Sequence, residues 1–490
     1  MRDIARKLDL LASNTKRIDG LTPLPQRIGL AAELAEEQDS ILEQRDIPLV
    51  DSAGPSDTGL QEGGYVKHVQ NSLQRGQAIL RFLVFEDVTE AMFLDKDTLV
   101  HYTVRVSSES LSTMLKSVCY ESDPTDISAH VVNPILGRFD ATSSYEAYRA
   151  LMGTIESLLR RTRILLVYPD RQLRNLAFEA LVTQAREGLR LGPDTRPSFL
   201  IDQLEVQYGL GASYRSCGSS VHRRENGEVR VLTAGLDCPQ TFTLADAVQY
   251  SSGLVPNSVE YPYSESLTRE VSAILQAQMG DVRPVSSASI AESTLADLPD
   301  RYTTVHIVAH FEIDAENPYL SSLVWAPSMH AKSSGESSAY RMAWLDLNGC
   351  MVFLSGCNTV RALGDTYERP LVNAFVSSGS TRIIGCLWNL DEEVSWRLAN
   401  EFYARIAQGK TPSSALREAK LALMRSGFVE PFYWAGLVLL CDSFDNDSGS
   451  TVESHAVSNA LIFPILLLVA LLVYLQSCIP WMRLSSTQHQ

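Results

Sequence analysis

Short apolar runs alternate with helical patterns along the C-terminal half of the chain. Residues 303–309 (TTVHIVA), 351–355 (MVFLS) and 382–387 (RIIGCL) are brief and continuously apolar, which is typical of strands covered on both faces. Downstream, apolar side chains recur every four residues from Val394 to Ile406, and this spacing predicts a helix with one buried face. Alternating strands and helices predict a mostly parallel sheet, with its ligand site beyond the carboxyl ends of the strands.

The ends of the predicted helices carry recognisable signals. Asp391, Glu392 and Glu393 precede the apolar pattern, and acidic side chains suit the positive end of a helix dipole. Thr411 and Pro412 predict the cap and first residue of a second helix, which Gly427 closes.

The N-terminal half has weaker signals. Residues 79–87 (ILRFLVFED) and 99–106 (LVHYTVRV), separated by the turn-forming DKD, predict an antiparallel pair. A helix is expected over 144–161 and a strand over 164–168. Residues 1–60 read as a helical segment followed by a linker, which includes DSAGPSDTGLQEGG at 51–64.

Composition narrows the function classes. The 490 residues have a net charge of -16, which argues against nucleic acid as a partner. The eight cysteines are scattered without C-x-x-C spacing, so neither a zinc site nor a disulfide scaffold is expected, and no cofactor motif is found. The N-terminus lacks the apolar core of a secretory signal, and the main body is therefore expected in the cytosol.

The C-terminal end contains a candidate membrane span. Residues 460–479 are 20 consecutive residues without a charge, the length of a transmembrane helix. A buried C-terminal helix is the alternative. The preceding linker, 442–459, is acidic, and the tail, 480–490, carries Arg483, a bias that favours the tail inside. Because the tail is short and no signal peptide precedes it, we expect a single-pass, tail-anchored protein whose main body faces the cytoplasm.

Two reactive side chains follow predicted strands directly. His310 comes after one apolar run and Cys357 after the next, 47 residues later. If the two strands are neighbours, these residues meet above the sheet edge. A thiol is a weak nucleophile at neutral pH, and a nearby imidazole makes its thiolate accessible. The alternative is that Cys357 only fills the core, as cysteine often does.

The amino-acid sequence of five segments, called blocks, resembles the CHAT family of caspase-like proteins. The blocks are VHIVAH, MVFLSGCNT, NAFVSSGSTRIIGCLWNLDEE, EFYARIAQGKTPSSALREAKLAL and PFYWAGLVLL, and similarity upstream includes ILLVYPDRQLRNLAFEALV. The resemblance covers about 74–441 and implies a caspase-like, three-layer α/β sandwich with a mostly parallel central sheet. Within a domain at 73–441, it implies an N-terminal, pseudo-caspase-like half at 73–235 and a catalytic half at 236–441.

For active members, the resemblance implies a cysteine peptidase with a Cys-His dyad and no metal. Carried onto this sequence, Cys357 is the nucleophile and His310 the proton-transferring partner. The backbone N–H groups of Cys357 and Phe311 would bind the oxyanion. His306 has no matching role and, like Cys350 and Cys386, reads as a core residue.

Two departures from the family pattern concern the oxyanion region. Members usually have glycine at the positions of Phe311 and Val360. Since glycine serves where a backbone approaches closely or takes positive φ, both changes predict strain or crowding. A catalytically inactive CHAT module, acting as a membrane-tethered interaction scaffold, is therefore the alternative to a peptidase, and a membrane structural protein that shares only the fold is a third.

Substrate preference is the least determined property. Related proteins often cleave after basic residues, and Asp391 and Glu392 lie where the family forms its pocket, so they are candidate substrate-binding carboxylates. The alternative is that both only cap the following helix. The expected partners are a protein or peptide substrate, an activating protein and the membrane, through residues 460–479.

Overall fold

The computed structural model describes residues 62–116, 118, 139–184, 196–210, 231–235, 282–286, 303–314, 321–324, 336–343, 345, 347, 349–363, 369–389, 391–441 and 444. The predicted N-terminal segment at 1–60, the acidic linker, apart from Phe444, the span at 460–479 and the tail lie outside these residues. Among the described helices, none combines the length and apolar character needed to cross a bilayer.

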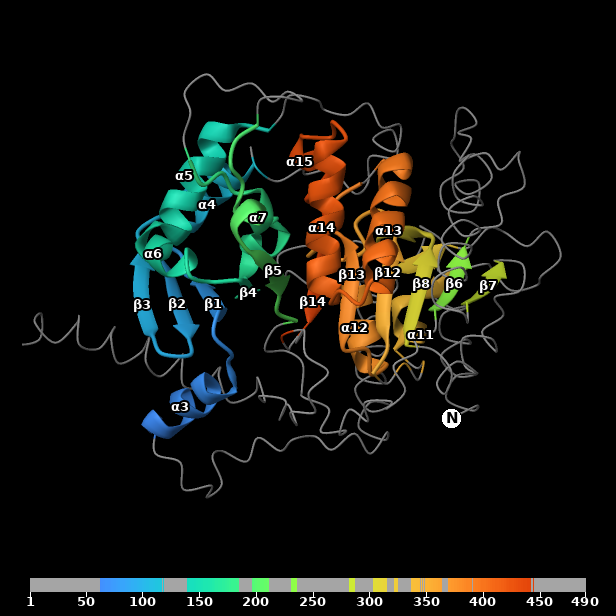
Figure 1. Cartoon of the computed structure of the whole chain (residues 1–490), viewed down its shortest axis with the longest axis horizontal. Helices are drawn as coiled ribbons and strands as arrows, with labels where there is room; N and C mark the ends of the chain where they lie inside the picture. Colours follow the sequence, from blue (N-terminus) through green and yellow to red (C-terminus); the bar gives the residue numbers. More distant parts are fainter. Residues whose placement is uncertain are drawn as a thin grey trace, which may run out of the picture. The chain divides into compact units, whose positions relative to one another are not determined.

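A large sheet organises the described part of the chain. Its strands are β1 (Gln77–Val84), β2 (Thr89–Asp95), β3 (Leu99–Val104), β4 (Ile164–Tyr168), β5 (Glu205–Tyr208), β6 (Val231–Gly235), β7 (Val282–Ser286), β8 (Thr304–Val308), β12 (Met351–Ser355), β13 (Arg382–Cys386) and β14 (Leu437–Cys441). They lie in the order β3-β2-β1-β4-β5-β14-β13-β12-β8-β6-β7, from left to right in Figure 1.

The sheet is mostly parallel, but apart from β2, which is antiparallel to both its neighbours, its strands fall into two sets of opposite direction. β1, β4, β5 and β14 run parallel to one another, and so do β13, β12, β8, β6 and β7. The two sets meet where β14 pairs antiparallel with β13. The expected α/β class with a mostly parallel sheet is confirmed. β6 falls within residues 73–235, which were predicted for the first half, yet it pairs with β8 of the second.

The first half differs from the predicted antiparallel pair. β1 and β3 do not pair with each other, because β2 lies between them and pairs with both. β2 buries Ala91 and Phe93 on one face, and this alternation holds it in the sheet despite its acidic residues. The helix expected over 144–161 is α5 (Ala141–Met152), a 3-10 turn and α6 (Glu156–Leu159).

Three further helices belong to this half. They are α3 (Glu62–Ser72), α4 (Ser108–Leu115) and α7 (Leu200–Gln203). α3 begins inside the segment predicted as linker, and its later residue Val69 is buried. Burial of the end of the helix thus outweighs the poor helix propensity of the glycines at its start.

The second half matches the predicted elements closely. It contains α12 (Pro370–Ser377), α13 (Glu392–Ala407), α14 (Pro412–Arg425) and α15 (Pro431–Trp434). The cap of α14 is Thr411, whose Oγ1 accepts a hydrogen bond from the N–H of Ser414. Gly427 follows the same helix with a φ of 105°, the left-handed conformation that commonly ends helices.

A small antiparallel sheet adjoins the end of β8. It consists of β9 (His310–Glu312), β10 (Ser322–Val324) and β11 (Glu336–Ser338), in the order β11-β10-β9, and leads into α11 (Ala339–Met342). The chain therefore passes from the large sheet into the small one at Ala309 and His310.

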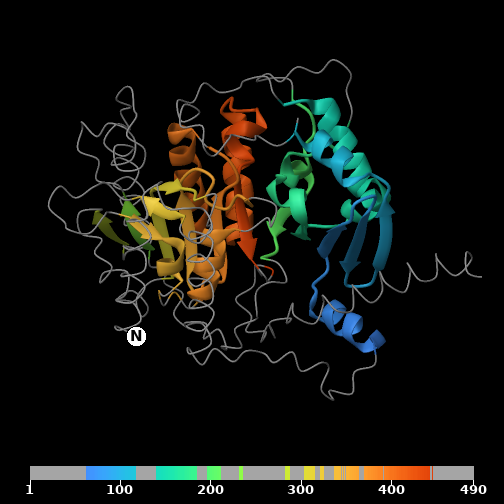
Figure 2. The same cartoon turned by 180° about the vertical axis from the view of Figure 1, so that it is seen from behind.

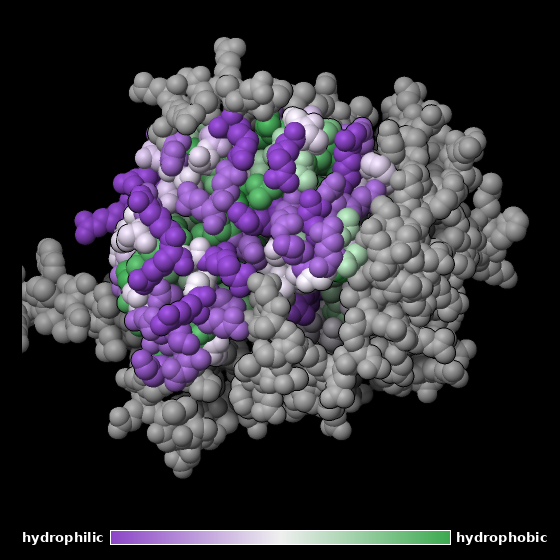
Figure 3. Space-filling view, viewed as in Figure 1, coloured by the Kyte–Doolittle hydropathy of each residue, from purple (hydrophilic) through white to green (hydrophobic). Residues whose placement is uncertain are grey.

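The core of the second half is aromatic. The ring of Phe353 on β12 lies 5.4 Å from that of Phe402 and 5.8 Å from that of Tyr403, both on α13. All five residues of β8 and of β12 are buried, so both faces of these strands are covered. Figure 2 shows the same elements from behind. On the face seen in Figure 3, hydrophilic residues dominate the described surface.

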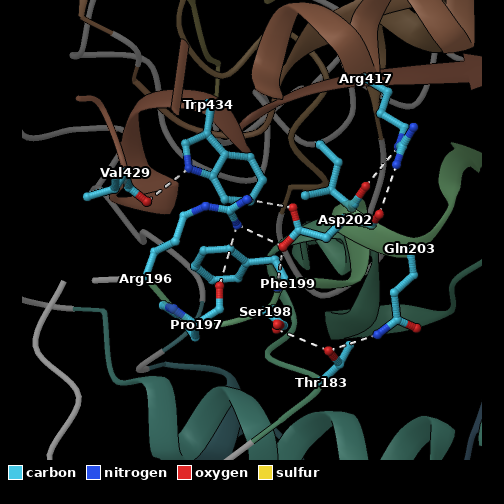
Figure 4. A network of polar contacts seen from close by, with 11 residues as sticks. Thr183, Arg196, Pro197, Ser198, Phe199, Asp202, Gln203, Arg417, Val429 and Trp434 are labelled. Atoms are coloured by element: carbon cyan, nitrogen blue, oxygen red, sulfur yellow. Dashed lines mark hydrogen bonds and ion pairs between the residues drawn. The ribbon is translucent and has the colours of Figure 1, made fainter. Parts of the chain in front are cut away.

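A polar network joins the two halves beside α14 (Figure 4). The Arg417 guanidinium donates to the carbonyl oxygens of Ile201, at 2.8 Å, and Asp202, at 3.0 Å. The Asp202 carboxylate in turn accepts from Arg196 at 2.7 and 2.8 Å. Phe199 packs edge-on against Trp434 at 5.2 Å between ring centroids. Polar and aromatic contacts thus tie α7 of the first half to α14 and α15 of the second.

Candidate active site

β8 and β12 are neighbouring parallel strands in matched register. Thr304 pairs with Met351, and the ladder continues to Val308 opposite Ser355. His310 and Cys357 each lie two residues beyond this last pair. The register therefore brings both residues to adjacent carboxyl ends of the sheet, the edge that the sequence predicted.

The two backbones touch directly ahead of these residues. The N–H of Ala309 donates to the carbonyl of Ser355 at 3.2 Å. A Cβ at Gly356 would lie 2.3 Å from the carbonyl oxygen of Ala309, so only glycine permits this approach. His310 itself opens β9, opposite Val324, and Cys357 is half-buried.

Residues 357–360 form a turn, the cysteine turn, which is held against the end of β13. Asn358 takes a left-handed φ of 57°. The N–H of Val360 donates to the carbonyl of Cys386 at 3.1 Å, and the N–H of Cys386 donates to Thr359 Oγ1 at 2.9 Å. These bonds fix the direction in which the chain leaves Cys357.

A buried amide pair supports the same turn. Asn358 Nδ2 donates to Asn389 Oδ1 at 2.6 Å, and both residues are more than nine-tenths buried. Sequence reasoning did not single out either asparagine. The position of Asn358 directly after Cys357 was the only available signal, because Asn389 becomes its neighbour only when β12 and β13 pair.

Phe311 and Val360 do not introduce the expected backbone strain. Among the described non-glycine residues, only Arg171 and Asn358 have positive φ, so neither departure from the family glycines occupies a conformation that needs glycine. Val360 is fully buried, and its Cγ1 lies where a Cβ at Gly385 would be 2.5 Å away. Phe311 pairs with Leu323 in the small sheet and packs on the core. The predicted strain from a positive φ is therefore not present at Phe311 or Val360. Gly385 leaves room for the Val360 side chain, and crowding of the oxyanion region stays a prediction.

Beneath the site, His306 is a core residue, as expected. It is 1% exposed, and its Nε2 lies 2.8 Å from Ser355 Oγ. Burial lowers the pKa of His306 to about 3, so the imidazole is neutral at physiological pH. Cys350 and Cys386 are buried as well, and burial raises the pKa of the Cys386 thiol.

Asp391 caps α13. Its Oδ1 accepts a hydrogen bond from the N–H of Val394 at 3.1 Å, and Glu392 is the first residue of the helix. The capping interpretation of Asp391 is thus seen directly. Its role toward substrate, and that of Glu392, stay predictions. Within the described residues no cluster of His, Cys, Asp or Glu has the arrangement of a metal site.

The family model described as "CHAT domain" matches residues 142–442, more than half of the 490 residues. The chain belongs to the CHAT domain family. The match includes β4, β5 and every described element of the second half, together with His310, Cys357 and Asp391. The CHAT resemblance of the sequence blocks is therefore confirmed.

Solved structures give weaker similarity. Gingipain R, an Arg-specific cysteine proteinase, is 8% identical, with 63% of this chain and 68% of that chain covered and a TM-score of 0.37. The Saccharomyces cerevisiae separase in complex with securin is 9% identical, with 78% and 30% covered and a TM-score of 0.39. No curated protein matches the chain. Similarity at this level carries no argument about the activity of the CHAT protein.

Proposed function

We propose that this CHAT protein is a caspase-like cysteine endopeptidase that uses Cys357 and His310 as a dyad. The observation that supports the proposal is the register of β8 and β12, which delivers both residues to adjacent strand ends. Thiol and imidazole at such a position are the groups that nucleophilic acyl transfer requires.

The proposed reaction follows from the chemistry of the two groups. His310 takes the proton of the Cys357 thiol, and the thiolate attacks the carbonyl carbon of a peptide bond. His310 then returns the proton to the leaving amine, which leaves a thioester on Cys357. Water, deprotonated by His310, hydrolyses the thioester and restores the thiol.

The oxyanion is assigned to backbone N–H groups. Those of Cys357 and Phe311 are the proposed donors, since any non-proline residue supplies an N–H. The ordinary backbone conformations of Phe311 and Val360 support this assignment. Without the dyad, the same fold would serve as the interaction scaffold considered above.

A basic preference is proposed for the substrate, with Asp391 and Glu392 as the opposing carboxylates. Asp391→Asn keeps an oxygen for capping Val394 but removes the charge. We expect the variant to lose preference for arginine over aspartate substrates while its melting temperature stays close to wild type. An unchanged cleavage profile in Asp391→Asn would remove the residue from the pocket.

A protein partner is proposed to activate the peptidase. Residues 460–479 are proposed to anchor it as a single-pass, tail-anchored membrane protein whose main body faces the cytoplasm. Expression in cells followed by alkaline carbonate extraction tests the anchor. The full chain is expected in the pellet, and a chain ending at 459 in the supernatant. Recovery of the full chain in the supernatant would contradict the proposal.

Cleavage itself is tested by a proteome-wide search for new protein termini. Cells expressing wild type are compared with cells expressing Cys357→Ala. New termini that depend on Cys357 support the peptidase. Identical termini in the presence of a bound partner would instead favour the scaffold.

A further inference from the structure

Arg174 and Asn175, two consecutive residues of the first half, form hydrogen bonds to Arg369 and Ala362, which both follow the cysteine turn in the chain. Asn175 Nδ2 donates to the carbonyl of Ala362 at 3.0 Å, and the N–H of Ala362 donates to Asn175 Oδ1 at 2.8 Å. The neighbouring carbonyl of Arg174 accepts a hydrogen bond from Arg369 Nη2. Ala362 and Arg369 are separated only by 363–368, and Ala362 lies five residues after Cys357.

The Asn175 carboxamide matches the backbone of Ala362 in both directions. An amide side chain presents an acceptor and a donor in one plane, and here each meets its complement on a single residue. An aliphatic side chain makes neither bond, and a carboxylate accepts but does not donate. The pairing therefore depends on asparagine and not only on side-chain size.

Asn175 is itself held firmly in the first half. It ends a 3-10 helix at Arg171–Asn175, whose Leu173 is fully buried. A few residues on, the buried Glu179 carboxylate accepts hydrogen bonds from Lys420 at 2.7 Å and from Tyr208 at 2.8 Å. Asn175 thus lies between two buried residues, Leu173 and Glu179, and Glu179 is bonded both to Tyr208 of the first half and to Lys420 of α14.

The cysteine turn is consequently held on two sides. The N–H of Val360 donates to Cys386 and Thr359 Oγ1 accepts from it, which fastens the turn to β13, and the Asn175 pair fastens the chain two residues beyond the turn to the first half. The bonds to β13 lie within three residues of Cys357, whereas Asn175 restrains the stretch beyond them. Loss of the Asn175 pair would remove the hold of the first half on Ala362, although Arg369 stays bonded to Arg174.

We propose that Asn175 is a positioning residue that fixes the cysteine turn from the first half of the sheet. As far as catalysis is concerned, this inference rests on the proposed Cys357-His310 dyad. The first half contains neither member of that dyad, so Asn175 gives it a direct route to the reactivity of Cys357. A protein partner that displaces residues 171–175 would act on the site through the same contact.

Hydrogen exchange of the full chain tests the contact without any reference to activity. Asn175→Ala is expected to speed exchange of the Ala362 amide by about tenfold, the effect of one lost hydrogen bond. Gln172→Ala is the matched control, because Gln172 lies in the same 3-10 helix but donates to Ser108 within the first half. Unchanged exchange of Ala362 in Asn175→Ala would overturn the proposal. Should that variant fail to fold, Asn175→Asp, which keeps the acceptor, is expected to retain protection of Ala362.

The effect on Cys357 is read from the pH dependence of its alkylation rate. We expect the profile of Asn175→Ala to move toward that of His310→Ala, Gln172→Ala to match wild type and Asn175→Asp to lie between them. Faster exchange of Ala362 with an unchanged alkylation profile would overturn the positioning role. If wild type and His310→Ala alkylate alike, the dyad fails instead, and the exchange experiment still judges the contact at Ala362.

Discussion

His306 Nε2 and Ser355 Oγ lie 2.8 Å apart across β8 and β12. The same two strands carry His310 and Cys357 beyond their ends. Ser355 Oγ is the partner of the buried imidazole at Nε2, and within the described residues its Nδ1 has no hydrogen-bond partner. The pair therefore links the two strands just below the proposed dyad.

Removing the Ser355 hydroxyl should leave the His306 imidazole without its hydrogen bond at Nε2. We expect Ser355→Ala to lower the free energy of unfolding by about 1 to 3 kcal/mol, the cost of an unsatisfied buried polar group. Urea unfolding of Ser355→Ala, His306→Phe and the double variant measures it. The double variant should lose less than the sum of the two single losses, and strict additivity would contradict the interaction.

Lowering the pH from 7 should reduce the stability of the fold because of His306. An unfolded histidine has a pKa of about 6.5, whereas burial lowers that of folded His306 to about 3. Between these values the unfolded chain binds a proton that the folded chain does not. The contribution is complete above pH 6.5 and is lost as pH falls toward 3. From pH 7 to 5 it amounts to about 2 kcal/mol.

Urea unfolding at the two pH values compares wild type with His306→Gln, which cannot titrate. Wild type should lose about 2 kcal/mol more than the variant. Equal losses would mean that burial does not shift the pKa of His306 and would contradict this prediction.

Because the backbone of Asn358 is left-handed, replacement by glycine should cost less stability than replacement by alanine. Glycine adopts a φ of 57° without a steric penalty, whereas alanine pays about 1 kcal/mol or more. Both lose the bond to Asn389. Asn358→Gly should therefore be more stable than Asn358→Ala by about 1 kcal/mol in urea unfolding. The reverse order would contradict the assigned conformation.

The buried pair Lys420 and Glu179 should be sensitive to loss of one partner. Lys420 is 0% exposed and Glu179 3%, and removing one member of such a pair leaves an uncompensated charge. Lys420→Met should lower the free energy of unfolding by about 3 to 5 kcal/mol, and adding Glu179→Gln should restore part of it. Thermal unfolding of the two variants measures the difference, and no recovery in the double variant would contradict the pairing.

The second half of the fold could be predicted from sequence because its strands are continuously apolar. Residues 351–355 form β12 with the predicted bounds, and His310 and Cys357 were found because each follows such a run. β2 escaped prediction, since TEAMFLD carries two acidic residues and buries only alternate positions.

The supporting residues of the site could not be predicted in the same way. Asn358 and Asn389 are 31 residues apart, and Asn175 and Ala362 are 187 apart. Their contacts depend on the order of strands in the sheet, which local patterns do not specify. The reversal of strand direction between β13 and β14 likewise depends on how these two strands pair, and no local pattern specifies it.

His310 is proposed to activate the Cys357 thiol. The most direct test of this activation is the rate at which a thiol-directed covalent probe labels Cys357 at pH 7 in wild type, His310→Ala and Cys357→Ala, with the labelled residue identified by mass spectrometry. Wild type should label at Cys357 at least about tenfold faster than His310→Ala, and Cys357→Ala should show no fast labelling. Equal rates in wild type and His310→Ala would contradict the account.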